Sequence, residues 1–382
     1  MNYKKQEIKR GINIHEIETD KFKTNLITVF LTTPITKENV TFNALIPAVL
    51  ARGSKTMHTA KDISKELENM YGASFDCGVD KAGDNQVLKF YLESINNEYL
   101  PEDEDLLKKS IEKLFEIVFN PYIEENGFKN EYVDGEKENL KQIIDGKKDN
   151  KAAYAYTRCI EEMYKNKPYG LYKYGYVEDL NKINRNNLYE YYKKLINNAK
   201  IDIFVSGKNI ENSIKIISEQ MKEIDAREPD FIVNEKCEER KNDDIKVIKE
   251  DMDVAQGKLV IGLNVNVDTK ESRYVALVYN AIFGGIPTSK LFQNVREKAS
   301  LAYTASSSYL RQKNNIFVKC GIEVENYDKA VEIIKKQLED MKLGNFEDED
   351  IVSAKNNIIS VVKSIPDEQD TRNNLLLWTG TC

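Results

Sequence analysis

The sequence predicts an α+β fold built from two similar halves. The chain has 382 residues, which is more than one hydrophobic core usually holds, so two domains are expected. A helix that ends on glycine before a second helix and paired strands occurs twice, at 48–53 and at 280–285. A charged segment with few large apolar residues, 234–251, lies between the copies and is typical of a linker. The expected domains are therefore 1–233 and 252–382.

Apolar alternation and helical periodicity predict the elements of the first half in turn. Strands are expected at 12–17, 26–32, 87–92 and 201–205. Thr59, with Asp62 three residues later, predicts the start of an amphipathic helix that ends at Gly72. Further helices are expected at 103–119, 127–147, 152–164, 185–197 and 210–224.

The second half repeats the beginning of this pattern but is shorter. Strands are expected at 259–265, 301–309 and 316–324, and helices at 272–283 and 327–342. Nothing after Trp378 corresponds to the last helices and the last strand of the first half. We therefore expect the second domain to be truncated at its C-terminus, unless these elements are dispensable.

Composition excludes several classes of function. The net charge is −7 and is spread over mixed segments, so nucleic acid and anionic membranes are not expected partners. No apolar run is long enough to span a bilayer, and no signal peptide follows the first lysines, which predicts a cytoplasmic protein. The five cysteines are far apart and form no C-x-x-C pair, so we expect reduced thiols.

The stretch FGGIPTSKLFQNVREKASLAY, residues 283–303, carries the most informative pattern. Its apolar stripe leaves Arg296 off the core-facing side of a helix, and Tyr303 follows in the next strand. An Arg and a Tyr that converge can donate hydrogen bonds to a peptide carbonyl and to its developing oxyanion. The residues alone also allow a structural role, in which Arg296 pairs with Glu297 and Tyr303 is half-buried in a sheet.

This stretch resembles the signature of the second domain of the insulinase-like (M16) metallopeptidase family. The resemblance implies two homologous α/β half-clamshell domains, each a mainly antiparallel sheet covered by helices. It also implies that Arg296 and Tyr303 bind a peptide and stabilise its transition state, in a chamber whose zinc lies in the first domain.

The zinc motif of that family, H-x-x-E-H, would fall on a predicted helix before Gly53. The two ligand positions are Ala44 and Ala48, and the general-base position is Pro47. None of these side chains has an atom that can bind a metal, and a catalytic zinc needs about three protein ligands. No metal ligand is therefore assigned to this chain, and zinc is expected only in a partner subunit.

The remaining candidates for metal ligands are weak. The third ligand would fall near Gln142 or Ile143, and Glu125 and Glu138 leave that alignment open. The chain has two histidines. His58, just before a helix, is interpreted as an exposed polar residue, and His15 as a surface or edge residue of a strand.

Within the M16 family, the chain is most similar to small bacterial subunits that lack the zinc motif, some of which are named for an association with modification of elongation factor P. The resemblance implies a subunit that is inactive alone and supplies Arg296 and Tyr303 in trans to a zinc-bearing homologue, as a heterodimer acting on a peptide or small protein. The alternative is a peptide- or protein-binding scaffold with no proteolytic role. A homodimer is possible when the partner is absent.

Overall fold

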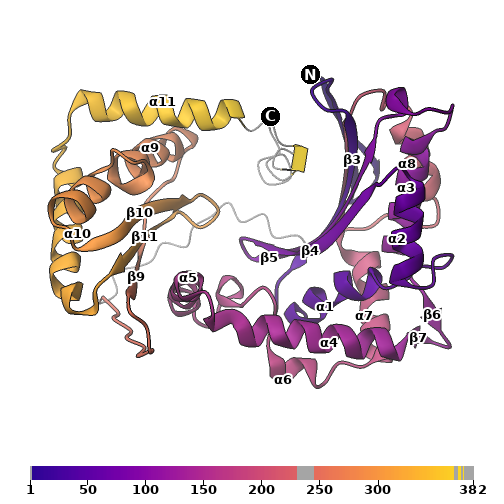
Figure 1. Cartoon of the computed structure of the whole chain (residues 1–382), viewed down its shortest axis with the longest axis horizontal. Helices are drawn as coiled ribbons and strands as arrows, with labels where there is room; N and C mark the ends of the chain where they lie inside the picture. Colours follow the sequence, from indigo (N-terminus) through magenta and orange to yellow (C-terminus); the bar gives the residue numbers. More distant parts are fainter. Residues whose placement is uncertain (1, 230–244, 365–368, 371–372, 374–382) are drawn as a thin grey trace. The chain divides into compact units, whose positions relative to one another are not determined.

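The computed structural model describes residues 2–229, 245–364, 369–370 and 373. The chain divides into two compact units, and each is discontinuous in sequence (Figure 1). Unit 1 comprises residues 1–146, 167–233 and 366–382, and unit 2 comprises residues 147–166 and 234–365. The sequence analysis, in contrast, expects two consecutive domains. Of the expected linker, 245–251 contains no helix or strand, and 234–244 lies outside the described residues.

Unit 1 is built on a six-stranded sheet with the order β1-β2-β8-β3-β5-β4. All neighbouring strands are antiparallel except β2 and β8, which pair in parallel. The strands are β1 (Asn2–Lys9), β2 (Ile12–Glu18), β3 (Thr24–Pro34), β4 (Ser74–Ala82), β5 (Asn85–Ile95) and β8 (Lys200–Gly207), and a separate hairpin joins β6 (Ile123–Glu124) to β7 (Gly127–Phe128). The mainly antiparallel sheet agrees with the predicted fold class.

Helices cover one face of this sheet and bury its main core (Figure 1). Alternate residues of the central strands, such as Ile27, Val29 and Leu31 of β3, point into that core. The helices are α1 (Val40–Leu50), α2 (Ala60–Asn69), α3 (Leu106–Phe119), α4 (Asn130–Asp145), α6 (Val177–Leu180), α7 (Arg185–Asn198) and α8 (Ser213–Gln220). Thr59 and Asp62 form the predicted capping box of α2.

The second face of the same sheet carries polar and aromatic side chains. Phe30 and Phe204 lie there in a separate small cluster, with their rings edge to face. Gln369 and Asn373, from the last part of the chain, also lie on this face. Gln369 donates a hydrogen bond to the Thr24 carbonyl, and Asn373 donates one to the Thr28 hydroxyl, both at 3.2 Å. Gln369 and Asn373 thus contact β3 within unit 1.

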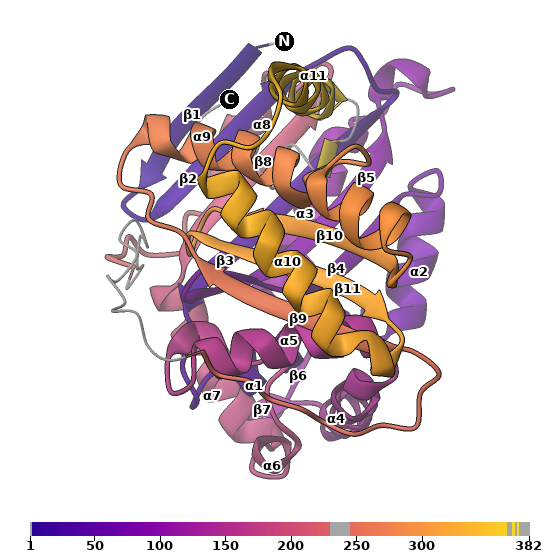
Figure 2. The ribbon, with the colours of Figure 1, turned by 90° about the vertical axis from the view of Figure 1, so that its left-hand side faces the viewer.

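Unit 2 contains a three-stranded antiparallel sheet with the order β10-β11-β9. Its core lies between the sheet and three helices, with two π-helical turns beside them. The elements are β9 (Gly257–Asn264), α9 (Lys270–Asn280), η4 (Ala281–Gly285), η5 (Phe292–Lys298), β10 (Ala302–Leu310), β11 (Asn315–Ile322), α10 (Tyr327–Lys342) and α11 (Asp348–Ser364). Figure 2 shows α9, α10 and α11 in front of the strands.

Helix α5 (Lys151–Met163) packs on the opposite face of the unit 2 sheet. Gly262 of β9 permits this, because a Cβ there would lie 2.0 Å from Met163 Sδ. The Tyr156 ring meets Phe317 edge to face, with centroids 5.0 Å apart. A helix that follows α4 in sequence therefore completes unit 2.

The strand orders show the internal duplication that the sequence suggests. In unit 1, β3, β5 and β4 are neighbours in that order, and in unit 2, β9, β11 and β10 are arranged in the same way. Each middle strand is antiparallel to both neighbours, and two helices follow it: α3 and α4 in one unit, α10 and α11 in the other. The two units are copies of one α/β pattern.

Candidate functional site

Helix α1 carries the three positions of the degenerate zinc motif. Ala44 is 9% exposed, Pro47 is buried and Ala48 is partly buried. The Pro47 carbonyl accepts hydrogen bonds from the Ala51 amide at 3.1 Å and from Cys77 Sγ at 3.3 Å. None of the three side chains has an atom that binds a metal, so these positions do not fit zinc.

The positions considered for a third ligand do not compensate. Gln142, Ile143 and Glu138 are exposed on α4. Glu125 lies before α4 in a left-handed backbone conformation with φ 54°, and its carboxylate lies 3.3 Å from Arg185. Among the described residues, no group of three or more His, Cys, Asp or Glu side chains is placed to hold a metal.

Sequence reasoning missed Glu136, the carboxylate of α4 that is buried. It is 8% exposed, and Arg52 Nε, just after α1, lies 2.5 Å from its Oε1. Asn139 donates a hydrogen bond to the other oxygen, Oε2, at 3.1 Å. Glu136 lies three residues after Val133 and four before Leu140, which places it on the core-facing stripe of α4. This spacing could have identified it as buried from the sequence. A guanidinium therefore balances the buried carboxylate beside α1.

Cys77 of β4 lies beside α1 and is partly buried. Burial, with smaller contributions from the charges of Asp76 and Glu136, raises the pKa of its thiol to about 12. Cys159 and Cys320 are free thiols as well, and burial raises their pKa values to about 11 and about 12. These cysteines are packing residues, as expected; Cys237 and Cys382 lie outside the described residues.

Arg296 lies on η5, a π-helical turn rather than the expected α-helix. Leu291 and Val295 are buried, whereas the Arg296 side chain is 43% exposed. Its guanidinium carbon lies 4.5 Å from the centre of the Phe292 ring, and Nε is 3.6 Å from Glu297 Oε1. An exposed ion pair of this kind contributes little to stability.

Tyr303 lies at the start of β10, close to the end of η5. The Leu301 amide donates a hydrogen bond to the Val295 carbonyl at 3.2 Å, and Ser300 between them has φ 52°. The register of β10 shifts between Ala302 and Thr304, so Tyr303 lies in a bulge, a feature that often redirects a side chain. Tyr303 is 61% exposed, so it is not the half-buried packing residue of the structural alternative.

The Val295–Leu301 hydrogen bond closes a short loop between η5 and β10. Arg296 directly follows one end of that bond and Tyr303 lies two residues beyond the other. Among the described residues, the Tyr303 hydroxyl has no hydrogen-bond partner. The pair therefore presents two exposed donor groups from one corner of unit 2.

The two histidines differ from each other. His58 is exposed, and its Nε2 lies 3.1 Å from the Lys55 carbonyl, which confirms the prediction. The prediction for His15 was wrong, because it is 4% exposed on a strand that has neighbours on both sides. Its ring stacks on Phe204, with centroids 4.1 Å apart.

His15 belongs to a buried polar chain on the second face of the unit 1 sheet. Its Nδ1 lies 2.8 Å from the Tyr3 hydroxyl and its Nε2 lies 3.1 Å from Asp202 Oδ1. Lys200 Nζ lies 2.8 Å from Asp202 Oδ2. Burial opposes ionisation of Asp202, but the hydrogen bond from His15 and the charge of Lys200 lower its pKa overall. This network is internal to the unit 1 sheet.

Comparison with known proteins identifies the family. A family profile described as "Peptidase M16 inactive domain" matches residues 182–358. The probable inactive metalloprotease YmfF of Bacillus subtilis is 38% identical over 346 residues, which cover 90% of this chain and 81% of that protein. The chain belongs to the M16 metallopeptidase family. The descriptions of the profile and of this relative, together with the three α1 positions, make it an inactive member.

Solved structures support the same fold. A conserved protein from Enterococcus faecalis superposes with a TM-score of 0.86 and 27% identity, covering all of this chain and 90% of the other. A peptidase M16 inactive domain from Pseudomonas fluorescens gives 0.74 at 16% identity, covering 95% and 84%. Among the described residues, no helix is long and apolar enough to cross a membrane.

Proposed function

We propose that this M16 protein is the non-catalytic subunit of a peptidase, and that Arg296 and Tyr303 act on a peptide bound in trans to a zinc-bearing M16 homologue. The observation that carries the proposal is the exposed pair itself. Tyr303 lies at a bulge, and its hydroxyl has no hydrogen-bond partner among the described residues; Arg296 lies on a π-helical turn and is 43% exposed beside Glu297 and the Phe292 ring. Turns of this type are frequent at functional sites.

In this role the two side chains would divide the work. The Arg296 guanidinium donates hydrogen bonds to a carbonyl of the peptide and fixes its position. The Tyr303 hydroxyl donates to the oxygen on which negative charge develops. The zinc, the water that it activates and the general base all belong to the partner, because Ala44, Pro47 and Ala48 cannot supply them.

The test is a peptidase assay on an unstructured fluorogenic peptide, with this chain alone, an H-x-x-E-H homologue from the same genome alone, and the two mixed. We expect activity in the mixture. Tyr303→Phe, which removes the donor to the developing charge, should lower kcat/KM of the mixture roughly 100-fold. Arg296→Ala, which removes the contact that positions the peptide carbonyl, should lower it by about 10-fold.

Two matched variants control for surface effects in unit 2. Arg311 is an exposed arginine on the turn between β10 and β11, and Tyr274 is an exposed tyrosine on α9. Arg311→Ala and Tyr274→Phe should leave the rate unchanged. A mixture that keeps full activity with Arg296→Ala contradicts the proposal. An inactive mixture in which this chain still binds the peptide would instead assign a scaffold role, with binding but no proteolysis.

A further inference from the structure

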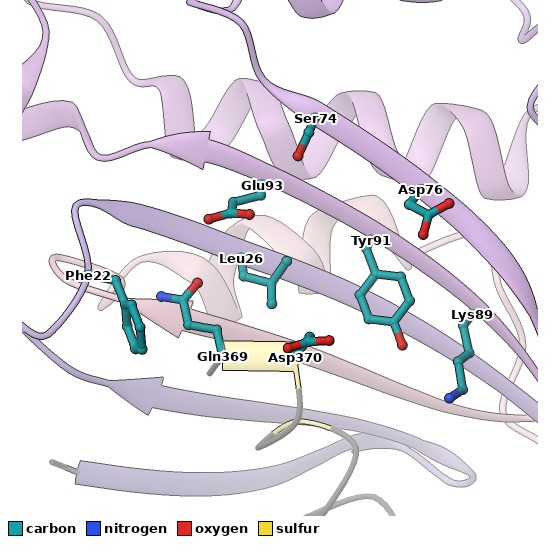
Figure 3. Close-up of a pocket in the computed structure, with 9 residues that line it drawn as sticks. All are labelled: Phe22, Leu26, Ser74, Asp76, Lys89, Tyr91, Glu93, Gln369 and Asp370. Carbon is teal, nitrogen blue, oxygen red and sulfur yellow. The ribbon is translucent and has the colours of Figure 1, made fainter. Parts of the chain in front are cut away.

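The second face of the unit 1 sheet has a cavity of about 520 Å³ beside its edge strand β4 (Figure 3). Side chains of β3, β4 and β5 line it, together with residues from the end of the chain. The lining includes the carboxylates of Asp76, Glu93 and Asp370. The ammonium of Lys89 also lines the cavity, but it lies 3.1 Å from Asp80 Oδ2. The cavity of unit 1 is therefore acidic.

The face of the unit 2 sheet on which α5 packs carries lysines and hydroxyl groups instead. The strands β9, β10 and β11 contain no Asp or Glu. Lys319 of β11 is paired with Ser306 of β10, and its diagonal neighbours include Thr304, Ser308 and Lys258. Paired residues on one face have Cβ atoms about 5 Å apart, and diagonal neighbours about 7–8 Å apart. Three hydroxyl groups and a second ammonium therefore surround Lys319.

The Lys319 ammonium is half-buried and lacks an acceptor. It lies 4.0 Å from the centre of the Tyr156 ring of α5, which attracts the cation but offers no oxygen to its three N–H groups. Among the described residues it has no ion-pair partner and no hydrogen-bond acceptor. Burial lowers the pKa of Lys319, because part of the hydration of its charge is lost. An anion at this position would supply the missing acceptor.

Two of the neighbouring hydroxyl groups are also available to a ligand. Ser306, which is exposed, and Ser308, which is half-buried, have no hydrogen-bond partner among the described residues. The Thr304 hydroxyl, in contrast, accepts a hydrogen bond from the Gly321 amide at 3.1 Å. Because carboxylate oxygens accept several hydrogen bonds at once, the Lys319 ammonium and the Ser306 hydroxyl can share one carboxylate.

The carboxylates nearest to this face in sequence already have partners. On α5, Glu161 and Glu162 lie 2.8 and 3.1 Å from the Arg158 guanidinium. Just after β11, Glu323 accepts a hydrogen bond from Asn326 Nδ2 at 3.1 Å. The described part of the chain therefore supplies no counter-charge to the lysine of β11.

This face adjoins the corner of unit 2 that carries Tyr303. Ser306 lies three residues after Tyr303 on β10, so their Cα atoms are about 10 Å apart. A peptide that places its reacting carbonyl at Tyr303 spans the same distance with about three residues. A group of the peptide that reaches Lys319 would therefore lie about three residues from that carbonyl.

We propose that Lys319 and Ser306 bind a carboxylate of the peptide, and that this contact selects substrates with an acidic residue or a C-terminus about three residues from the reacting bond. Both groups donate hydrogen bonds to the carboxylate, and Lys258 adds attraction at longer range. The acidic cavity of unit 1 disfavours the same group. This inference rests on the proposed function, and it adds the chemical class of substrate that is selected.

The experiment measures the binding of ten-residue peptides with a neutral dye to the full chain, by fluorescence anisotropy at low salt. The reference peptide has a central glutamine and an amidated C-terminus, so it has no carboxylate. A second peptide has glutamate in place of the glutamine, and a third keeps the glutamine but has a free C-terminal carboxylate. We expect at least one of the two charged peptides to bind about 10-fold more tightly than the reference, because a charge-assisted hydrogen bond is gained. The peptide that does so identifies the source of the carboxylate.

Variants assign the preference to Lys319. Lys319→Met removes the charge but keeps a similar stem, and it should reduce the affinity for the favoured peptide to that for the reference. Lys319→Arg keeps a cation and should keep a preference of several-fold, whereas Ser306→Ala should reduce the preference about 3-fold. Lys335→Met, at an exposed lysine of α10 on the other side of the sheet, is the matched control and should change neither affinity. Circular dichroism should confirm that all variants stay folded.

The outcomes separate this inference from the proposed function. Equal binding of all three peptides would overturn the carboxylate preference. A preference that survives in Lys319→Met, or equal losses in Lys319→Met and Lys335→Met, would overturn the assignment to Lys319. No binding of any peptide would overturn the inference as a whole. The mixed-subunit assay, with an amidated substrate that lacks acidic residues, still decides the proposed function, because that substrate has no carboxylate for Lys319.

Discussion

The surroundings of α1 and the corner formed by η5 and β10 are the two regions that the family relates to catalysis, and they differ in how their key side chains are held. At α1, the motif positions are small or apolar and are packed against their neighbours, and the Arg52–Glu136 pair lies beside them. At η5 and β10, Arg296 and Tyr303 remain polar and exposed. Residues that keep a fold in place are buried and paired, whereas residues kept for a ligand project from strained or irregular backbone. The comparison teaches that the α1 positions are packed into the core of unit 1, whereas Arg296 and Tyr303 stay exposed in unit 2.

The largest effect is expected when the zinc ligands are restored at α1. Ala44→His/Ala48→His places two imidazoles one helical turn apart, but Ala44 is 9% exposed and has no space for a larger side chain. Overpacking and buried polar atoms should lower the free energy of unfolding by roughly 2–4 kcal/mol. Zinc should not restore stability, because two imidazoles fall short of the roughly three protein ligands that zinc needs. Urea denaturation with and without zinc, together with metal analysis, measures this.

A matched control separates packing from the histidines themselves. Lys61→His/Lys65→His puts the same pair at the same spacing on exposed positions of α2. Its stability should change by less than about 0.5 kcal/mol. One bound zinc per chain and a zinc-dependent rise in Tm for the α1 variant would show that the site is still open to a metal, and the contrast between the two regions would then fail.

A smaller effect is expected when the ion pair beside α1 is broken. Arg52→Met leaves the Glu136 carboxylate 8% exposed without its cation, which should cost about 2 kcal/mol of unfolding free energy. Arg52→Met/Glu136→Gln should recover most of that loss, because the buried charge is also removed. Thermal or urea unfolding of the three proteins measures the coupling between the two residues.

The control for this ion pair is Arg10→Met. Arg10 pairs with Glu228 while both side chains are mostly exposed, so its loss should cost less than about 0.5 kcal/mol. If Arg52→Met is no more harmful than Arg10→Met, the pair beside α1 has no structural role, and α1 would no longer differ from the exposed corner in unit 2.

Much of the fold could be predicted from local patterns, and the misses have physical causes. The central strands and most of the long helices match because their periodicity is regular, but α11 (Asp348–Ser364) was not predicted. The strands β1 and β4 were not predicted, since NYKKQEIK and SFDCGVDKA are polar edge strands with weak alternation. Helix α8 is shorter than the expected 210–224.

The candidate sites were predictable to different degrees for a related reason. Arg296 could be found because the apolar stripe of its own segment shows that it faces outward. The burial of His15 depends on Phe204 and Asp202, which are nearly 190 positions away in the chain, so no local pattern reveals it. The cavity beside β4 likewise combines three strands with the end of the chain.

The smallest effect on stability is expected at Arg296 and Tyr303. This prediction tests the contrast with the α1 region most directly. Arg296→Ala and Tyr303→Phe should each change the free energy of unfolding by less than about 0.5 kcal/mol, because neither side chain is buried or strongly paired. Val295→Ala, one residue before Arg296 and fully buried, should cost about 2 kcal/mol in the same urea titration. A loss above 1.5 kcal/mol for Arg296→Ala would mean that the side chain stabilises η5, and any effect on the mixed peptidase would then follow from damage to the fold. Neutral stability together with a loss of rate would support the proposal that the pair acts on the peptide.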